Sequence, residues 1–193
     1  MSKTYSKTRI LVEGALMIAL STVLSMIQIP LMPHGGSITL FSMVPILVMS
    51  YRHGAKWGLF TGFVNSCLQM IMGFYPPPAS TFLYFLGEVL LDYVLAFGVI
   101  GVAGLGKGKP GGIFWGSILG GAARFIIHYI SGITIYKIVA PTEIFGTVFD
   151  NPSLYSLVYN GSYVGIDIVL CLVIFGILYA PLKKYFTGAD LKK

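Results

Sequence analysis

The stretch "STFLYFLGEVLLDYVLAFGVIGVAGLGKGKPGG", residues 80–112, joins a long apolar run to a short basic loop. Its apolar part, residues 80–105, exceeds the roughly 20 mostly apolar residues that a transmembrane helix needs. The loop that follows is rich in glycine, contains a proline and carries Lys107 and Lys109. This pattern predicts a membrane helix that ends on the positively charged, cytoplasmic side of a membrane.

The composition of the whole chain agrees with this interpretation. Of its 193 residues, 55% are hydrophobic and only 10% are charged, whereas a soluble domain usually carries about 25% charged residues. The chain is also short enough to form one domain. We therefore expect an all-α integral membrane protein in which residues 1–193 form a single membrane domain.

Six apolar runs in the sequence are candidates to cross the membrane. The predicted spans are residues 9–29, 37–51, 56–75, 80–105, 112–135 and 158–181. The second is short and contains Pro45, so we expect it to be tilted, kinked or partly re-entrant. The first could instead be a signal peptide, but it is longer than the apolar core of one and lacks a small-residue cleavage site. We interpret it as the first helix.

The basic residues fall almost entirely on one side of these spans. Eleven of the thirteen lie before the first span, between the second and third spans, between the fourth and fifth spans, or after the sixth span. They are Lys3, Lys7, Arg9, Arg52, Lys56, Lys107, Lys109, Lys183, Lys184, Lys192 and Lys193. The positive-inside rule then predicts that both termini of this multi-pass cell-membrane protein are cytoplasmic. The net charge of +6 is thus a topology signal, and no nucleic-acid partner is expected.

No motif of an enzyme is visible in the sequence. "GVAGLGKG", residues 101–108, is close to a phosphate-binding loop, but Gly108 stands where a serine or threonine would hold magnesium. Nucleophile-elbow and zinc-protease motifs are lacking as well. Cys67 and Cys171 lie far apart in apolar runs and show no metal-ligand spacing. We therefore expect no enzyme, no metal site and no cofactor.

Six ionisable residues lie within the predicted spans. They are Glu13, Glu88, Asp92, Arg124, His128 and Asp167. Such residues are costly to bury in a bilayer and commonly mark functional sites. Because carboxylates outnumber cations here, either some carboxyls are protonated or a cationic ligand visits. The alternative is internal pairing, for which the partners considered for Arg124 are Asp92, Glu88 and Glu13. A structural role is favoured for Glu13 and Asp167.

The fifth predicted span carries a polar stripe. In "RFIIHYISGITIY", residues 124–136, one helical face presents Arg124, His128, Gly132 and Tyr136 at four-residue intervals. Gly132 leaves room for a flat group beside the backbone. A purely structural face would seldom combine arginine with histidine, so the stripe indicates one wall of a ligand site.

Two more polar candidates lie at the outer start of the sixth span. An aromatic belt at the membrane surface would explain Tyr155 but not Asn160. The amide of Asn160 can donate to and accept from a heterocycle. Together with Asp92, these residues indicate a pocket that opens to the outside. Such a pocket suits a flat organic cation through charge pairing and cation–π contact.

At these residues the chain resembles the thiamine-specific S-component of energy-coupling-factor (ECF) vitamin transporters. The resemblance covers nearly the whole chain and is carried by "GGSITLFSMVPILVMSYRHGAKWGLFTG", "LLDYVLAFGVIGVAGL", "RFIIHYISG" and "YSLVYNG". The family's binding residues match this sequence at Asp92, Tyr93, His128, Gly132, Tyr155 and Asn160. To these we add Tyr136, where some relatives have tryptophan, and Glu88, which either contacts the ligand or pairs with Arg124.

The resemblance also implies a partner. Members of this family capture thiamine from outside and dock on a shared ECF module of one transmembrane coupling protein and two ATPases. Their docking motif, Ala-x-x-x-Ala on the first helix, matches Ala15 and Ala19. Such a partner, embedded in the same membrane lipid, would supply the ATPase that the sequence lacks.

Three other functions are compatible with the sequence. The chain could be an S-component for another small vitamin. It could also be a self-sufficient secondary transporter of an organic cation, with Glu88 or Asp92 as a proton site, although no internal repeat supports this. A membrane scaffold is the third, and it leaves the polar stripe unexplained.

Overall fold

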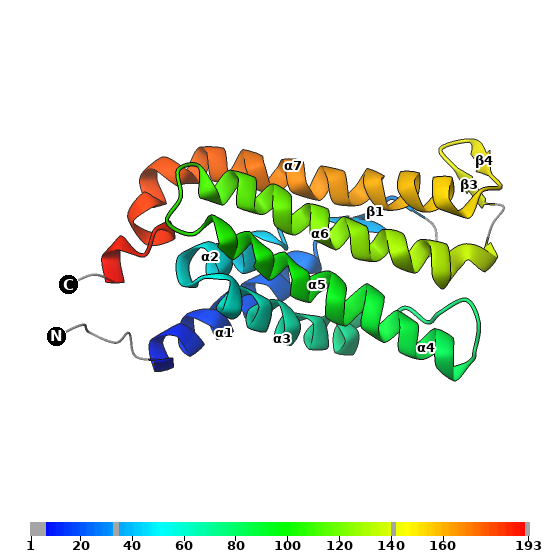
Figure 1. The fold of residues 1–193 in the computed structure, drawn as a ribbon, viewed down its shortest axis with the longest axis horizontal. Helices are drawn as coiled ribbons and strands as arrows, with labels where there is room; N and C mark the ends of the chain where they lie inside the picture. The colour runs from blue at the N-terminus through cyan, green and yellow to red at the C-terminus, as the bar shows by residue number, and fades with distance from the viewer. Residues whose placement is uncertain (1–6, 33–34, 140–141, 192–193) are drawn as a thin grey trace.

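The computed structural model describes residues 7–32, 35–139 and 142–191. It is an elongated helical bundle, and the first and last described residues lie at the same end of it (Figure 1). A hydrogen bond of 3.2 Å from Arg9 Nη2 to Asp190 Oδ2 joins these two ends of the chain. Lys3, Lys192 and Lys193, which belong to the charge pattern of the sequence, lie outside the described residues.

Helices make up most of the bundle. Their bounds are α1 (Lys7–Ser25), α2 (Val44–His53), α3 (Ala55–Gly73), the consecutive α4 (Phe82–Glu88), η2 (Val89–Leu95), α5 (Ala96–Gly98) and η3 (Val99–Gly106), α6 (Gly112–Thr134), η4 (Tyr136–Val139), α7 (Pro152–Phe186) and η5 (Ala189–Leu191). Within the described residues, four stretches are long and apolar enough to cross a membrane, namely Lys7–Ser25, Phe82–Gly106, Gly112–Thr134 and Pro152–Leu191. The structure is therefore mostly helical, as predicted, and length and composition support four of the six predicted spans.

The junction of the first two predicted spans is a β-hairpin rather than helix. α1 ends at Ser25 instead of residue 29, and β1 (Gln28–Pro30) pairs antiparallel with β2 (Ser37–Thr39). α2 begins only at Val44, because Pro45 occupies its first turn, where a missing N–H costs no hydrogen bond. Its ten residues extend about 15 Å, half of a hydrocarbon core about 30 Å thick. The second predicted span is thus only partly helical.

The connection between α6 and α7 contains a second hairpin. β3 (Thr142–Ile144) pairs antiparallel with β4 (Thr147–Phe149), and both turn residues have positive φ, 50° at Phe145 and 77° at Gly146. α7 then begins at Pro152 rather than residue 158, because the side chain of Asn151 caps it. Asn151 Oδ1 accepts hydrogen bonds of 2.8 Å from the Ser153 amide and 3.3 Å from the Leu154 amide.

The helical rod from α4 to η3 departs from α-helical geometry in its middle and at its end. η2, which contains Asp92, is π-helical, and η3 is a 3-10 helix. η3 lies directly on the backbone of α3, since a Cβ at Gly101 would be 2.1 Å from the Leu59 nitrogen and one at Gly104 would be 2.2 Å from the Ala55 nitrogen. Glycine is required for this approach. π-helical turns are frequent at functional sites.

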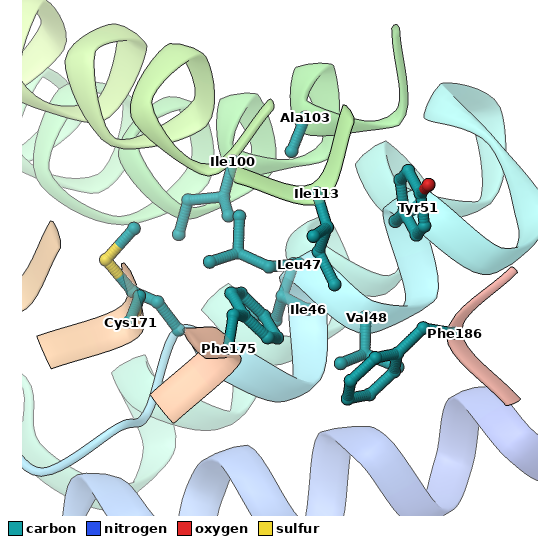
Figure 2. Close-up of a cluster of buried hydrophobic side chains, with 11 residues drawn as sticks. Ile46, Leu47, Val48, Tyr51, Ile100, Ala103, Ile113, Cys171, Phe175 and Phe186 are labelled. Carbon is teal, nitrogen blue, oxygen red and sulfur yellow. The ribbon is translucent and has the colours of Figure 1, made fainter. Parts of the chain in front are cut away.

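An apolar core fills the end of the bundle where the described chain begins and ends. Figure 2 shows side chains from α2, η3, α6 and α7 pointing toward one another in this core. Its buried members are Met43, Ile46, Leu47, Val48, Tyr51, Ile100, Ala103, Ile113, Cys171, Phe175 and Phe186. Short α2 lies at the centre of this core, so its backbone is held by packing from several helices.

A charged cluster closes the same end of the bundle. The Arg52 side chain is fully buried, and its guanidinium donates 2.7 Å to Glu13 Oε2, 2.6 Å to Asp190 Oδ1, and also to the Tyr185 carbonyl. Its carbon Cζ lies 4.2 Å from the centroid of the Tyr185 ring. His53 Nε2 lies 2.7 Å from Glu13 Oε2. Arg52 therefore joins α1, α2 and the C-terminal segment, and Glu13 has the structural role that the sequence favoured.

Candidate functional site

A cavity of about 470 Å³ lies in the half of the bundle away from the chain ends. All eight residues predicted for the ligand site line it, namely Glu88, Asp92, Tyr93, His128, Gly132, Tyr136, Tyr155 and Asn160. They come from the α4–η2 rod, α6, η4 and α7. Because ligand pockets commonly measure about 300–1,000 Å³, the cavity has room for a small organic molecule.

Asp92 is held in place by two groups of α6. His128 Nδ1 lies 2.7 Å from Asp92 Oδ1, and the Ser131 hydroxyl donates to Asp92 Oδ2. The Asp92 side chain nevertheless keeps 17% of its surface exposed. Its carboxyl is therefore fixed from one side and open to the cavity from the other.

The protonation of His128 follows from its neighbours. Arg124 Nε lies 3.4 Å from His128 Nε2. A guanidinium can only donate, so Nε2 accepts and the ring proton resides on Nδ1. Nδ1 then donates to Asp92, which accepts from both of its partners. The network thus assigns a neutral His128 that donates to the Asp92 carboxyl.

Arg124 pairs with Asp167 rather than with Asp92, Glu88 or Glu13, the partners considered for the alternative of internal pairing. Arg124 Nη1 lies 3.3 Å from Asp167 Oδ2 across the α6–α7 interface, and both side chains are buried. Asp167 Oδ1 also accepts a 3.1 Å hydrogen bond from the Thr39 amide of β2. This pair neutralises the one cation that lines the cavity among the described residues.

Glu88 has no such partner. Its side chain is buried, with 2% exposed, and within the described residues its Oε2 atom makes no hydrogen bond. The carboxyl forms side-chain hydrogen bonds with Tyr136 and with Asp92. The acidic groups of the cavity therefore outnumber its available cations, and this imbalance favours a positively charged ligand.

Asn160 is engaged mainly in joining α7 to α6. Its Nδ2 lies 3.2 Å from the His128 carbonyl, 3.0 Å from the Ser156 carbonyl and 3.1 Å from Ser156 Oγ. Its Oδ1 accepts a 2.9 Å bond from the Tyr163 hydroxyl. Because an amide oxygen has two lone pairs, one acceptor position of Asn160 is left for a ligand donor among the residues that the structure describes.

Gly132 has a different role from the one its sequence position indicates. A Cβ there would lie 2.1 Å from Ser156 Oγ and 2.7 Å from Ser156 Cβ. The room beside its backbone is thus taken by α7 rather than left for a flat ligand group. Gly132 lines the cavity because it lets the two helices approach closely.

Tyr155 belongs to a row of tyrosines that forms much of one wall, and the other two, Tyr159 and Tyr163, were not predicted for the site. Tyr155, Tyr159 and Tyr163 follow one another along α7, with ring centroids 5.4 Å and 5.9 Å apart. Tyr159 Oη accepts a 2.8 Å hydrogen bond from the Gly36 amide, which ties the wall to the first hairpin. Their four-residue spacing is a helical stripe, so the sequence contained a signal for Tyr159 and Tyr163.

A second group of missed residues comes from α1, α3 and the first hairpin. Ser25, Gln28 and Gln69 line the cavity, and Gln69 Nε2 donates 3.0 Å to Ser25 Oγ. Tyr93, which also lines the cavity, stacks on Phe74 at 5.4 Å between ring centroids. The cavity thus combines acids, amides and aromatic rings. Among the described residues, no group of three or more His, Cys, Asp or Glu could hold a metal ion.

Proteins that are already known resemble this chain in sequence. A family model described as "Thiamine transporter protein" matches residues 11–187. The chain belongs to this thiamine transporter family. The thiamine transporter ThiT of Bacillus subtilis is 31% identical over 188 residues, which cover 88% of this chain and 89% of that protein. ThiT of Lacticaseibacillus paracasei is 28% identical over 205 residues, covering 95% and 92%.

A solved structure of ThiT from Listeria monocytogenes shares the fold. It matches with a TM-score of 0.74 at 24% identity, over 93% of this chain and 98% of that chain. Membership of the thiamine transporter family identifies the chain as a transporter rather than an enzyme, and as a multi-pass protein of the bacterial cell membrane. The family resemblance noted in the sequence is thus confirmed.

Proposed function

We propose that this member of the thiamine transporter family binds thiamine in the cavity and acts as the substrate-binding S-component of an ATP-driven ECF transporter. The observation that carries the proposal is the Asp92 carboxyl, which two side chains of α6 hold by hydrogen bonds beside an aromatic wall. The thiazolium of thiamine is a permanent organic cation. A fixed countercharge and tyrosine faces together suit such a group.

Two parts of the cavity match the two rings of thiamine. The thiazolium would lie near Asp92, where its charge is offset. The aminopyrimidine would lie near Tyr155 and Asn160, with its exocyclic amine donating to the free lone pair of Asn160 Oδ1. Tyr93 and Tyr136 would contact the rings from the rod and from η4.

Delivery would depend on the ECF module, which docks on α1. Ala15 and Ala19 are exposed, whereas Gly14 and Ile18 on the same helix are buried in the bundle. The alanines therefore lie on the face of α1 that points away from this chain. Small side chains there leave the helix backbone accessible to a partner helix.

Calorimetric titration of the purified protein tests the ligand. We expect one thiamine to bind per chain with no ATPase present, and hydroxymethylpyrimidine, which lacks the cation, to bind far more weakly. Equal affinity for the two would show that Asp92 does not recognise the cation.

A proton-coupled secondary transporter is the second candidate function, because the buried carboxyl of Glu88 is of the kind that binds a proton within a membrane. Thiamine uptake by the protein alone, in vesicles with a proton gradient, would favour it.

A further inference from the structure

The Glu88 carboxyl is in an environment that does not suit a negative charge. It is buried, one of its oxygens has no hydrogen-bond partner among the described residues, and it faces a second carboxyl at Asp92. Tyr136 of η4 and Tyr93 of the rod are the other titratable groups in its surroundings. Burial of an unpaired charge is costly, and a like charge nearby adds to the cost.

The cations of the described chain are committed elsewhere or lie far from Glu88. Arg124 pairs with Asp167 and donates to His128, and its Cζ lies 4.9 Å from the Phe97 ring centroid. Lys137 is exposed beside Tyr136, and no contact joins it to the Glu88 carboxyl among the described residues. The other described lysines and arginines lie in α1, α2, α3, the loop after η3 or the last turn of α7, at the end of the bundle opposite the cavity.

The two carboxyls differ in how well a charge on each is stabilised. Asp92 accepts hydrogen bonds from His128 and Ser131, and both favour its ionised form. Glu88 instead has a hydrogen bond with Tyr136 and one with the Asp92 carboxyl itself, and a hydrogen bond between two carboxyls needs a proton on one of them. If one proton occupies this pair of acids, Glu88 is therefore the group that holds it.

We propose that Glu88 is a proton-binding site and that the cavity exchanges this proton for its organic cation. In the empty cavity the Glu88 carboxyl is neutral. When the cation enters, the O–H bond of the carboxyl breaks, the proton passes to water at the open side of the cavity, and the carboxylate stays as a second countercharge. The total charge of the site is the same before and after the exchange. This inference rests on the proposed function, because it requires a cationic ligand.

Proton exchange predicts how affinity depends on pH. Where Glu88 is protonated in the free protein, each bound cation must expel a proton. Thiamine affinity then falls as pH falls, by up to about tenfold per pH unit. Where Glu88 is already ionised, affinity no longer changes with pH through this group. The pair of acids thus makes capture of the cation weaker in acidic surroundings.

Calorimetry in two buffers measures the exchanged proton directly. Thiamine is titrated into the full chain at one pH in phosphate and in Tris, whose ionisation enthalpies differ, and the difference in observed enthalpy gives the number of protons released. We expect the wild type to release a fraction of a proton that approaches one as the pH is lowered. Glu88→Gln should bind thiamine without this release, and Glu143→Gln, which changes an exposed acid of β3, should behave as wild type.

The outcomes separate this inference from the proposed function. Tight thiamine binding by the wild type with no buffer dependence would overturn the proton exchange and leave the proposed function intact. Release that persists in Glu88→Gln would assign the proton to another group and overturn the role of Glu88. Failure of the wild type to bind thiamine would overturn both proposals. The buffer comparison on the wild type needs no variant, so it tests the proton exchange even if Glu88→Gln folds poorly.

Discussion

At the scale of single residues, the orientation of the Asp92 carboxyl depends on partners that never need to touch a ligand. His128 and Ser131 each satisfy one of its oxygens. Without them a carboxyl in a π-helical turn could rotate away from the cavity, and its charge would be less well stabilised. Ser131 itself is buried and lies three residues beyond His128 on α6. The hydroxyl is thus a positioning group for the countercharge.

Ser131→Ala tests this positioning. Removal of one hydrogen bond of this kind is expected to cost about 0.5–1.5 kcal/mol, which corresponds to about twofold to tenfold weaker thiamine binding. Thr134→Ala is the matched control, since its hydroxyl bonds only carbonyls of its own helix in the described structure and its side chain is exposed. Equal affinities for wild type and Ser131→Ala, measured by calorimetry, would show that Asp92 needs no such support.

At the scale of elements, α1 has one face committed to the bundle and another available to a partner. Gly14 and Ile18 pack inward, while Ala15 and Ala19 remain exposed. A bulky side chain on the outer face would hold a docking helix away from the α1 backbone without altering the cavity, which lies in the other half of the molecule.

Ala15→Trp and Ala19→Trp are therefore expected to leave thiamine affinity unchanged and to abolish uptake by cells that contain the ECF module. The uptake of labelled thiamine and the affinity of the purified variants are the two measurements. Leu16→Trp, beside the pair on the same helix and exposed in wild type, is a control for added bulk alone. Normal uptake by both alanine variants would contradict docking at this face.

The Arg52 cluster joins three elements at the end of the bundle opposite the cavity. Its guanidinium is buried and hydrogen-bonds Glu13 of α1 and Asp190 of η5. Arg52→Gln would remove the buried cation of these acids and leave them only the exposed Arg9 as a charged arginine partner, and breaking a buried ion pair destabilises proteins by up to about 3–5 kcal/mol. We expect a clearly lower temperature of thermal unfolding. Lys56→Gln, which removes an exposed charge on α3, should change the unfolding temperature little. Equal unfolding temperatures for the two variants would contradict a stabilising role of the Arg52 cluster.

At the scale of the whole molecule, the sequence was most informative where a property depends on composition or on spacing along one helix. The helical membrane fold followed from the apolar runs, and the residues around the cavity followed from four-residue stripes such as His128 with Gly132. The sequence was least informative about contacts between two elements. The pairing of Arg124 with Asp167 and the contact of Gly132 with Ser156 depend on how α6 packs against α7, which no local pattern encodes.

The same limit explains the first hairpin. Residues 26–29 and 37–43 are apolar enough to resemble the ends of two helices, and only Pro45 marks the true start of α2. The hairpin matters to the site because the amide of Gly36 donates to Tyr159 and that of Thr39 donates to Asp167. Backbone groups of the hairpin thus support a site whose side chains were only partly predicted.

Thiamine binding by Asp92→Asn is the measurement that tests the central claim most directly. The substitution keeps the shape of the side chain and removes the countercharge that the cavity presents to the ligand. A hydrogen bond to a charged group is worth about 1.5–3 kcal/mol, so we expect affinity to fall by about tenfold to more than a hundredfold, while Glu143→Gln binds as wild type. Undiminished thiamine affinity in a well-folded Asp92→Asn protein would contradict the account.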